Sequence, residues 1–211
     1  LKEPLRMITN YSQLLEKSLN GKITNEQREY INYLQQGGTR MMKVLKDLLL
    51  LSKINLSSDK ELVDVNNLLN ALIFTLGELI TKHKVQITYT AMPELVADNE
   101  YLFQLFENLI TNAIYHRNGK DPVIHISYLA GTDEHRFEIE DNGPGIPLEY
   151  REKVFVIFQR LHNRQDHEGN GIGLAICKKV VDSMKGKIWV EDSNLGGAKF
   201  VITLPFATTS T

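Results

Sequence analysis

Apolar residues recur at helical spacing over residues 1–19, and a polar stop, Asn20-Gly21-Lys22, follows them. A second helix is expected to begin just after Thr24, because Thr24 and Gln27 have the spacing of a capping box. The apolar positions that follow alternate between steps of three and four, which is heptad spacing: Ile31, Leu34, Gly38, Met41, Leu45 and Leu48. The first fifty residues are therefore predicted to form a helical hairpin.

The heptad stripe of this hairpin has too little partner surface within two helices. We expect a second copy of the chain to cover it, which gives a dimeric four-helix bundle through residues 1–56. The alternative is that the stripe packs on the remainder of its own chain. The length of the second helix, about seven turns by heptad counting, favours the dimer.

Strands and helices alternate after a polar, serine-rich linker over residues 55–59. Alternating patterns predict strands at 63–65, 85–89, 123–128, 136–140, 187–191 and 199–204. Helical spacing predicts helices at 66–82, 99–116 and 173–184, the second of them capped by Asp98. Hairpin-like neighbours near the end favour an α/β sandwich, a mixed sheet covered on one face by helices, over a parallel doubly wound sheet. The predicted class is α+β, with domains at 1–56 and 57–211.

Composition narrows the function classes. The chain has 211 residues, 42% hydrophobic and 24% charged, as is ordinary for a soluble globular protein. Its net charge of −2, with both signs mixed along the chain, gives no basic surface for nucleic acid. No apolar run approaches the roughly 20 residues that span a bilayer, and we find no signal peptide. The single cysteine, Cys177, suits a buried position in a cytoplasmic protein, and a membrane anchor elsewhere in a longer protein stays open.

The first candidate for chemistry is Asp141, which follows a strongly alternating predicted strand. It opens a loop with two glycines and a proline, Asp141-Asn142-Gly143-Pro144-Gly145-Ile146. A carboxylate in such a place can accept a hydrogen bond from an exocyclic amine such as that of adenine, and glycines let a flat ligand approach the backbone. A solvated Asp-Asn-Gly turn is the alternative.

The second candidate is a pair of asparagines, Asn108 and Asn112, on the predicted helix over 99–116. Their spacing of four places both carboxamides on one helical face. Asparagine is a mediocre helix former in an interior position, so the pair suggests a function. Neutral amide oxygens can coordinate Mg²⁺ and leave its other positions to water and substrate phosphates. Hydrogen bonding to neighbouring backbone is the alternative.

The third candidate is a glycine loop, Gly169-Asn170-Gly171-Ile172-Gly173-Leu174, that passes straight into an apolar helical pattern. Backbone N–H groups at a helix N-terminus favour the phosphates of a nucleotide. A dinucleotide fold would need a strand immediately upstream, where the sequence has a polar stretch, and no P-loop run is present. That stretch, between Phe158 and Gly169, is predicted to serve as a lid over the nucleotide.

Four segments, in this order, resemble the N, G1, F and G2 boxes of sensor histidine kinases. They are Asn108 to Asn112, Asp141-x-Gly143-x-Gly145, Phe155-x-x-Phe158-x-Arg160 and Gly169-x-Gly171-x-Gly173-Leu174. The hairpin is similar to that family's dimerisation and histidine phosphotransfer domain, and residues 1–6 resemble the tail of its H box. The resemblance covers nearly the whole chain, and the stretch around Glu3 and Pro4 looks like the phytochrome-associated branch.

The resemblance implies a site for ATP and Mg²⁺. In it Asp141 would read adenine, and Asn112 would be the principal Mg²⁺ ligand with Asn108 beside it. Arg160 would offset charge on the triphosphate, so that Asn108 and Arg160 take the catalytic roles. The implied nucleotide site comprises Asn108, Asn112, Tyr115, His116, Asp141, Gly143, Gly145, Ile146, Phe158, Arg160, Gly169, Gly171, Ile172, Gly173 and Leu174.

The implied activity is that of an ATP-dependent histidine kinase. It would transfer the γ-phosphoryl group to a histidine on the first hairpin helix, for relay to an aspartate of a response regulator receiver domain. An upstream sensor domain is expected outside this chain. Related ATPases carry a water-activating glutamate where this chain has Asn108, so we expect transfer to a side chain rather than hydrolysis.

The chain departs from the family pattern at several positions. The acceptor histidine is expected two residues before Leu1, whereas the six histidines present all lie at or beyond His83. Glu3 stands where many members have Thr or Asn, which puts phosphatase activity in doubt.

Three further departures touch the nucleotide site. Tyr115 replaces a lysine near the phosphates, His116 an aromatic residue, and Ala198 a Ser or Thr. Two alternatives therefore stay open: a degenerate ATP-binding scaffold that only dimerises and docks a partner, and a related serine or dehydrogenase kinase. The latter proteins keep the glutamate where Asn108 stands.

Overall fold

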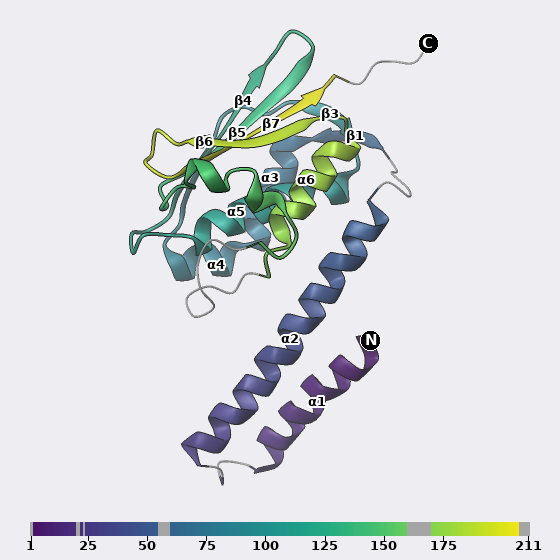
Figure 1. Ribbon diagram of the computed structural model, residues 1–211, viewed down its shortest axis with the longest axis vertical. Coiled ribbons are helices and arrows are strands. Elements are labelled where there is room, and N and C mark those ends of the chain that lie inside the picture. Colours follow the sequence, from purple (N-terminus) through teal and green to yellow (C-terminus); the bar gives the residue numbers. More distant parts are fainter. Residues whose placement is uncertain (1, 20–21, 23, 55–59, 160–169, 207–211) are drawn as a thin grey trace. The chain divides into compact units, whose positions relative to one another are not determined.

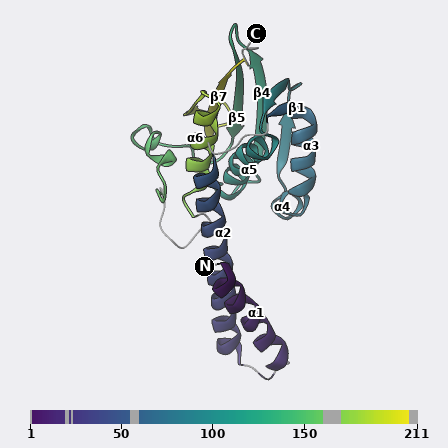
Figure 2. The same cartoon turned by 90° about the vertical axis from the view of Figure 1, so that its right-hand side faces the viewer.

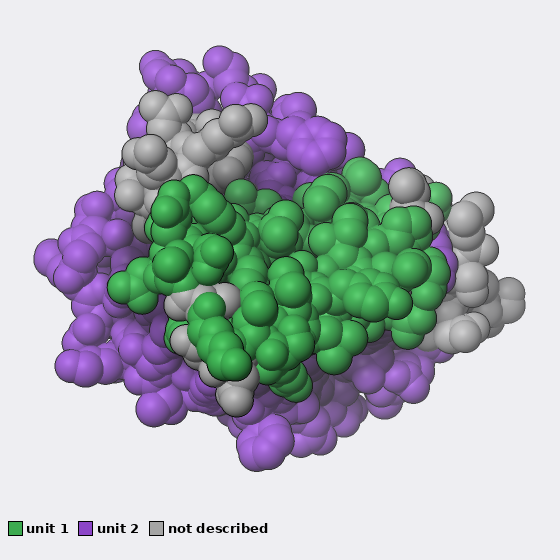
Figure 3. Space-filling model, turned by 90° about the horizontal axis from the view of Figure 1, so that it is seen from below, with its two compact units in different colours: residues 1–52 green, residues 53–211 purple. Residues whose placement is uncertain are grey.

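The computed structural model describes residues 2–19, 22, 24–54, 60–159 and 170–206. The predicted linker over 55–59 lies outside the described residues, as do the predicted lid, Arg160 and Gly169. The chain divides into two compact units, residues 1–52 and 53–211, which Figure 3 distinguishes by colour. Within the part that the structure describes, every helix is too short or too polar to cross a membrane.

The first unit is a pair of helices, α1 (Lys2–Leu19) and α2 (Asn25–Lys53), which run side by side (Figures 1 and 2). The predicted capping box is confirmed at the start of α2. The Thr24 backbone N–H donates to Gln27 Oε1 at 2.9 Å, and the Gln27 N–H donates to Thr24 Oγ1 at 3.2 Å. Two of the N–H groups at this helix end are thereby satisfied.

The heptad seam of α2 is covered only in part by α1. Ile31 and Gly38 are buried, and a Cβ at Gly38 would lie 2.5 Å from Thr9 Oγ1 of α1. Other seam positions, including Leu34 and Met41, are about half exposed. Both helices contribute to an apolar surface of exposed side chains: Met7, Ile8, Tyr11, Leu14, Leu15, Tyr30, Tyr33, Leu34, Met41, Leu48 and Leu49.

The second unit contains a five-stranded mixed sheet. Its helices are α3 (Val65–Thr75), α4 (Gly77–His83), α5 (Asn99–Tyr115) and α6 (Gly173–Ser183). Its strands are β1 (Glu61–Asp64), β2 (Gln86–Tyr89), β3 (Glu94–Ala97), β4 (Val123–Ala130), β5 (Glu134–Asp141), β6 (Lys187–Asp192) and β7 (Ala198–Pro205), with 3₁₀ turns η1 (Leu148–Tyr150) and η2 (Lys153–Phe155). The sheet order is β2-β4-β5-β7-β6, with β2 and β4 parallel and the other pairs antiparallel, while β1 and β3 form a separate antiparallel pair.

Helices cover one face of the sheet, as predicted (Figure 1). Phe137 and Ile139 of β5 are buried on that face, and the ring of Phe106 in α5 meets that of Phe137 edge-on, with centroids 5.8 Å apart. The residues that alternate with them carry charge, and Arg136 pairs with Glu138 at 2.7 Å on the other face. This period-two alternation places the core between the sheet and its helices.

The structure corrects two boundaries near the start of this unit. The predicted helix over 66–82 is in fact two helices, since α3 ends at Thr75 and α4 begins at Gly77. The break falls at a glycine, which has the lowest helix propensity of any residue except proline. The predicted strand over 63–65 ends one residue earlier. Asp64 accepts hydrogen bonds from the backbone N–H groups of Asn66 and Asn67 and thus caps α3 from Val65 onward.

Strand β3 was not predicted at all. Its four residues are too few for a clear alternation, and it forms by pairing with β1, which lies about thirty residues away in the chain. The predicted cap that follows is confirmed: Asp98 Oδ1 accepts a hydrogen bond from the Tyr101 N–H at 3.2 Å. The short β1–β3 pair therefore leads directly into α5.

Candidate nucleotide-binding site

Asp141 is the last residue of β5 and only 6% of it is exposed. Its Oδ1 accepts hydrogen bonds from the backbone N–H groups of Gly143, at 2.8 Å, and Ala198, at 3.0 Å. Its carbonyl oxygen accepts from the Gly197 N–H at 3.1 Å. Two separate loops thus fix one oxygen of the carboxylate. None of the described residues donates to the other oxygen, Oδ2, so this acceptor is left for a ligand.

Burial raises the pKa of the Asp141 carboxyl, because a charge is poorly solvated there, while the two backbone N–H donors act in the opposite direction. A buried acceptor of this kind discriminates strongly between ligands. A ligand that donates a hydrogen bond satisfies it, and one that does not leaves it unpaired.

Glycines surround the Asp141 carboxylate because side chains would collide with its partners. A Cβ at Gly197 would meet the Asp141 carboxylate and carbonyl, and a Cβ at Gly143 would meet the carbonyl oxygen of His116 at the end of α5. Gly145 has φ +71°, a backbone conformation that favours glycine. The predicted glycines are therefore needed for close approach, and Gly143 joins the Asp141 loop to α5.

The two asparagines of α5 lie on the side that faces α6. Asn108 Oδ1 accepts from Gln104 Nε2 at 3.4 Å and lies 3.3 Å from where a Cβ of Gly173 would stand. Asn108 Nδ2 is buried and has no hydrogen-bond partner among the described residues. The side chain also lies beside the buried thiol of Cys177, whose pKa it acts to lower. Asn112 lies one turn further along α5 and is half-buried.

Helix α6 begins at Gly173, and Ile172, which precedes it, provides no side-chain cap. The Phe158 N–H donates to the carbonyl of Gly171 at 2.7 Å, and a Cβ at Gly171 would lie 3.1 Å from Phe158 Cα. N–H groups at the start of a helix favour an anion, so this end suits a phosphate.

The departures from the family pattern at Tyr115, His116 and Ala198 leave the hydrogen bonds of Asp141 in place. Ala198 holds Asp141 through its backbone N–H, which any residue at that position except proline would supply. The ring of Tyr115 meets His83 of α4 edge-on, with centroids 6.1 Å apart, and His116 is exposed just after α5. Leu174 and Ile146 are half-buried beside their glycines.

Sequence reasoning missed one contact in this region. Arg151 donates through Nε to the carbonyl of Ile146, at 3.1 Å, and pairs through Nη2 with Asp192 at the end of β6. The two charged residues are 41 positions apart in the chain. Neither residue belongs to a recognised motif, and nothing in the sequence next to either one indicates that the two would pair.

The fold and the candidate site together indicate a class of protein. A mixed sheet is covered by helices on one face, and the candidate residues come from the end of strand β5, from helix α5 and from the start of helix α6. Residues 97–208, more than half of the chain, match the family model of the Histidine kinase-, DNA gyrase B-, and HSP90-like ATPase. Residues 1–57 match that of the His Kinase A (phospho-acceptor) domain. The chain therefore belongs to the sensor histidine kinases, which confirms the resemblance seen in the sequence.

Individual relatives agree with this assignment. The Cyanobacterial phytochrome A of Nostoc sp. is 38% identical over 206 residues, which is 97% of this chain and 27% of the phytochrome. Full-length ShkA in complex with AMPPNP has a TM-score of 0.77 at 25% identity, over 100% of this chain and 44% of ShkA. Histidine kinase ThkA in complex with response regulator protein TrrA has a TM-score of 0.72 at 23% identity, over 99% of this chain and 60% of that chain. This second similarity is one of fold alone. The chain spans about a quarter of the phytochrome's length.

Proposed function

We propose that this chain is the catalytic core of a sensor histidine kinase, which binds Mg²⁺-ATP and transfers the γ-phosphoryl group to a histidine expected two residues before Leu1, next to the first helix of the hairpin. The observation that carries the proposal is the path of α5. One part of α5, at Asn108, faces the first turn of α6, and its end, at His116, contacts Gly143 beside Asp141. At 1.5 Å per residue these two places are about 12 Å apart along the helix. A nucleotide with its base at Asp141 and its phosphates at α6 would lie along this stretch.

The proposed roles follow from the donors and acceptors at each place. Asp141 Oδ2 would accept the exocyclic amine of adenine, and the backbone of residues 171–174 would bind phosphate oxygens. Asn112 would hold Mg²⁺ through its amide oxygen, with Asn108 beside it; the metal, when bound, neutralises charge on the phosphates. Phosphoryl transfer depends mainly on such positioning and charge stabilisation. The roles of Arg160 and Gly169 stay predictions, because both lie outside the described residues.

The proposal extends to partners and place. The apolar surface shared by α1 and α2 supports a homodimer through residues 1–56, because exposed apolar area of this extent marks an interface. A response regulator is the proposed acceptor of the phosphoryl group, supported by the ThkA complex with TrrA. An upstream sensor domain is proposed because the phytochrome relative is several times longer. ATP and a free thiol at Cys177 suit a cytoplasmic location.

Calorimetric titration with Mg²⁺-AMPPNP tests the nucleotide site. We expect the chain to bind, and Asn112→Ala to abolish detectable binding, because it removes the proposed metal ligand. Asn32→Ala is the matched control, since Asn32 is an exposed asparagine on α2 in the other unit. Unchanged affinity in Asn112→Ala would show that the metal and phosphates bind elsewhere.

Phosphoryl transfer is tested separately with labelled ATP. Residues 1–52 contain no histidine, so we expect nucleotide binding without labelling of the hairpin. Extension of the chain at its amino end, with a histidine two residues before Leu1, should give an acid-labile phosphoryl group on that histidine. Stoichiometric labelling of the unextended chain would place the acceptor elsewhere.

A further inference from the structure

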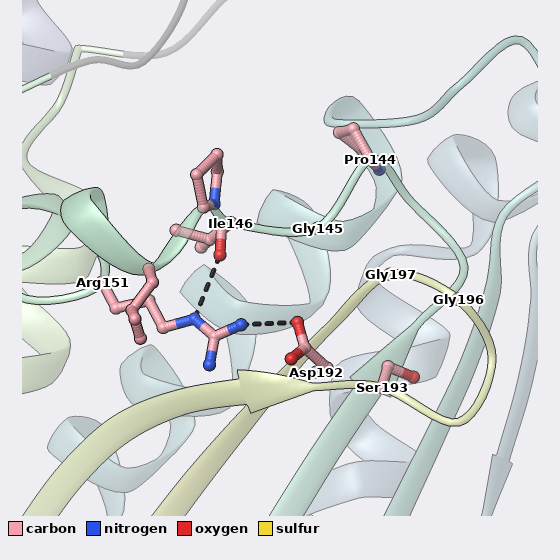
Figure 4. Close-up of a pocket in the computed structure, with 10 residues that line it drawn as sticks. Pro144, Gly145, Ile146, Arg151, Asp192, Ser193, Gly196 and Gly197 are labelled. Atoms are coloured by element: carbon pink, nitrogen blue, oxygen red, sulfur yellow. Dashed lines mark hydrogen bonds and ion pairs between the residues drawn. The ribbon is translucent and has the colours of Figure 1, made fainter.

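A cleft of about 500 Å³ lies between the Asp141 loop and the turn that joins β6 to β7 (Figure 4). One wall is formed by residues 144–148 and the other by residues 192, 193, 196 and 197, with Arg151 between them. Neither Asp141 nor Asn112 is among the described residues that line it. The cleft therefore adjoins the proposed nucleotide site through Gly145 and Ile146 without containing its adenine-reading acid.

Arg151 connects the two walls. Its guanidinium donates through Nε to the carbonyl oxygen of Ile146 at 3.1 Å and pairs through Nη2 with Asp192 Oδ1 (Figure 4). Only 20% of the Arg151 side chain is exposed, whereas 84% of the Asp192 side chain is. The hydrogen bond to Ile146 is thus the better shielded of the two contacts, and solvent weakens the ion pair.

The loops that form the two walls also hold the Asp141 carboxylate, through residues next to the walls. Gly143 donates to it from the first wall's loop, and Ala198 donates to it just beyond the second. The walls meet where a Cβ of Gly145 would lie 3.4 Å from the carbonyl oxygen of Gly197. A change in the distance between the walls would therefore move the donors that orient Asp141.

The charge in the cleft does not indicate an anion site. The guanidinium of Arg151 already has Asp192 as its counter-ion and the Ile146 carbonyl as an acceptor. A second anion would compete with Asp192 rather than find an unpaired cation. Through these contacts Arg151 connects the Asp141 loop to the turn between β6 and β7.

We propose that Arg151 is a positioning residue of the nucleotide site: it ties the Asp141 loop to the β6–β7 turn and so holds Gly145 and Ile146 in the conformation that receives the nucleotide. The inference rests on the proposed function, since it names a determinant of affinity for the same nucleotide. The physical reason is preorganisation, because a loop that is already ordered loses less freedom when the ligand binds.

Three variants test the proposal by calorimetric titration with Mg²⁺-AMPPNP. Arg151→Gln removes both contacts and should weaken binding about tenfold, the effect of one hydrogen bond to a charged group. Arg151→Lys keeps a charge opposite Asp192 and should restore part of the loss. Asp192→Asn keeps the Ile146 hydrogen bond and should cost less than about threefold, because Asp192 is exposed.

Lys153→Gln is the matched control. It removes the same charge two residues away, where Lys153 Nζ lies over the Tyr150 ring at 5.5 Å and does not line the cleft. Affinity in this variant should equal that of the wild type. If Lys153→Gln lost as much affinity as Arg151→Gln, the effect would be due to the change in net charge, and the inference would be overturned.

Two further measurements distinguish positioning from a general structural role. The nucleotide-free Arg151→Gln chain should unfold cooperatively no more than about 6 °C below the wild type, the shift expected when one hydrogen bond to a charged group is lost, while amide exchange over residues 142–150 becomes faster. Weaker binding accompanied by faster amide exchange throughout residues 60–206, or binding with wild-type affinity, would overturn the inference alone. A wild-type chain that binds no nucleotide would instead overturn the proposed function on which it rests.

Discussion

Replacement of Asp141 by asparagine should abolish ATP recognition and leave the nucleotide-free chain folded. An asparagine Oδ1 can accept the same two backbone N–H groups, from Gly143 and Ala198, that now lie 2.8 and 3.0 Å from the carboxylate oxygen. Its Nδ2 would then stand in place of Oδ2. A donor would face the exocyclic amine of adenine, which is itself a donor.

The expected loss of affinity combines two effects. A hydrogen bond to a charged acceptor is worth about 1.5–3 kcal/mol, and a buried donor left without a partner costs about 1–3 kcal/mol. Together they predict a loss of about 2.5–6 kcal/mol, which is roughly 10²- to 10⁴-fold in the dissociation constant. Inosine triphosphate, which carries a carbonyl where adenine has its amine, should lose less, because the new amide can donate to it.

The stability of the nucleotide-free chain should change in the opposite direction and depend on pH. Burial raises the folded-state pKa of Asp141 above its unfolded value. Its favourable contribution is therefore complete below the unfolded pKa and is lost as pH rises through the folded pKa. At pH 7 the wild type holds a poorly solvated charge that Asp141→Asn lacks, so the variant should be equally or more stable. The difference should shrink as pH falls toward about 4.

Titration calorimetry with Mg²⁺-AMPPNP and with inosine triphosphate measures the first effect, and urea unfolding at pH 7 and pH 4 measures the second. Binding of Mg²⁺-AMPPNP by Asp141→Asn within threefold of the wild type would refute the adenine-reading role. A variant that is much less stable than the wild type at pH 7 would refute the view that burial penalises this charge.

The adjacent helical glycines of α2 give a matched pair of substitutions. In Gly37→Ala the new Cβ meets nothing within 4 Å, so the free energy of unfolding should rise by about 0.5–1 kcal/mol. In Gly38→Ala the new Cβ would lie 2.5 Å from Thr9 Oγ1, so the free energy of unfolding should fall by about 1–3 kcal/mol. Equal effects of the two substitutions in urea unfolding would contradict the close α1–α2 contact. Cys177 is fully buried, and burial raises the pKa of its thiol well above the ordinary value. It should react with a disulfide reagent only as the chain unfolds, and rapid labelling of the native chain at pH 8 would show that the site opens.

Local rules made much of the fold predictable. The capping box at Thr24 and the cap at Asp98 depend on atoms within three residues of one another, and both are present as the sequence predicts. Alternation located the strands of the large sheet because one face of each had to be apolar. The break at Leu76 was missed because the apolar spacing continues across it, and the weak helix propensity of Gly77 was outweighed in the pattern.

The chain order of Asn108, Asp141 and Gly171 predicted the family, which the family models confirm, and it predicted a nucleotide as the ligand, because these residue types can supply the donors and acceptors that a nucleotide needs. Only the tertiary structure decided how that site is held. The turn after β6 brings Ala198 to Asp141, and Arg151 reaches Asp192 across 41 residues. Such contacts depend on which strands become neighbours in the sheet. The pairing of β5 with β7 is set by the free energy of the whole packed core, and no single segment of the sequence specifies it.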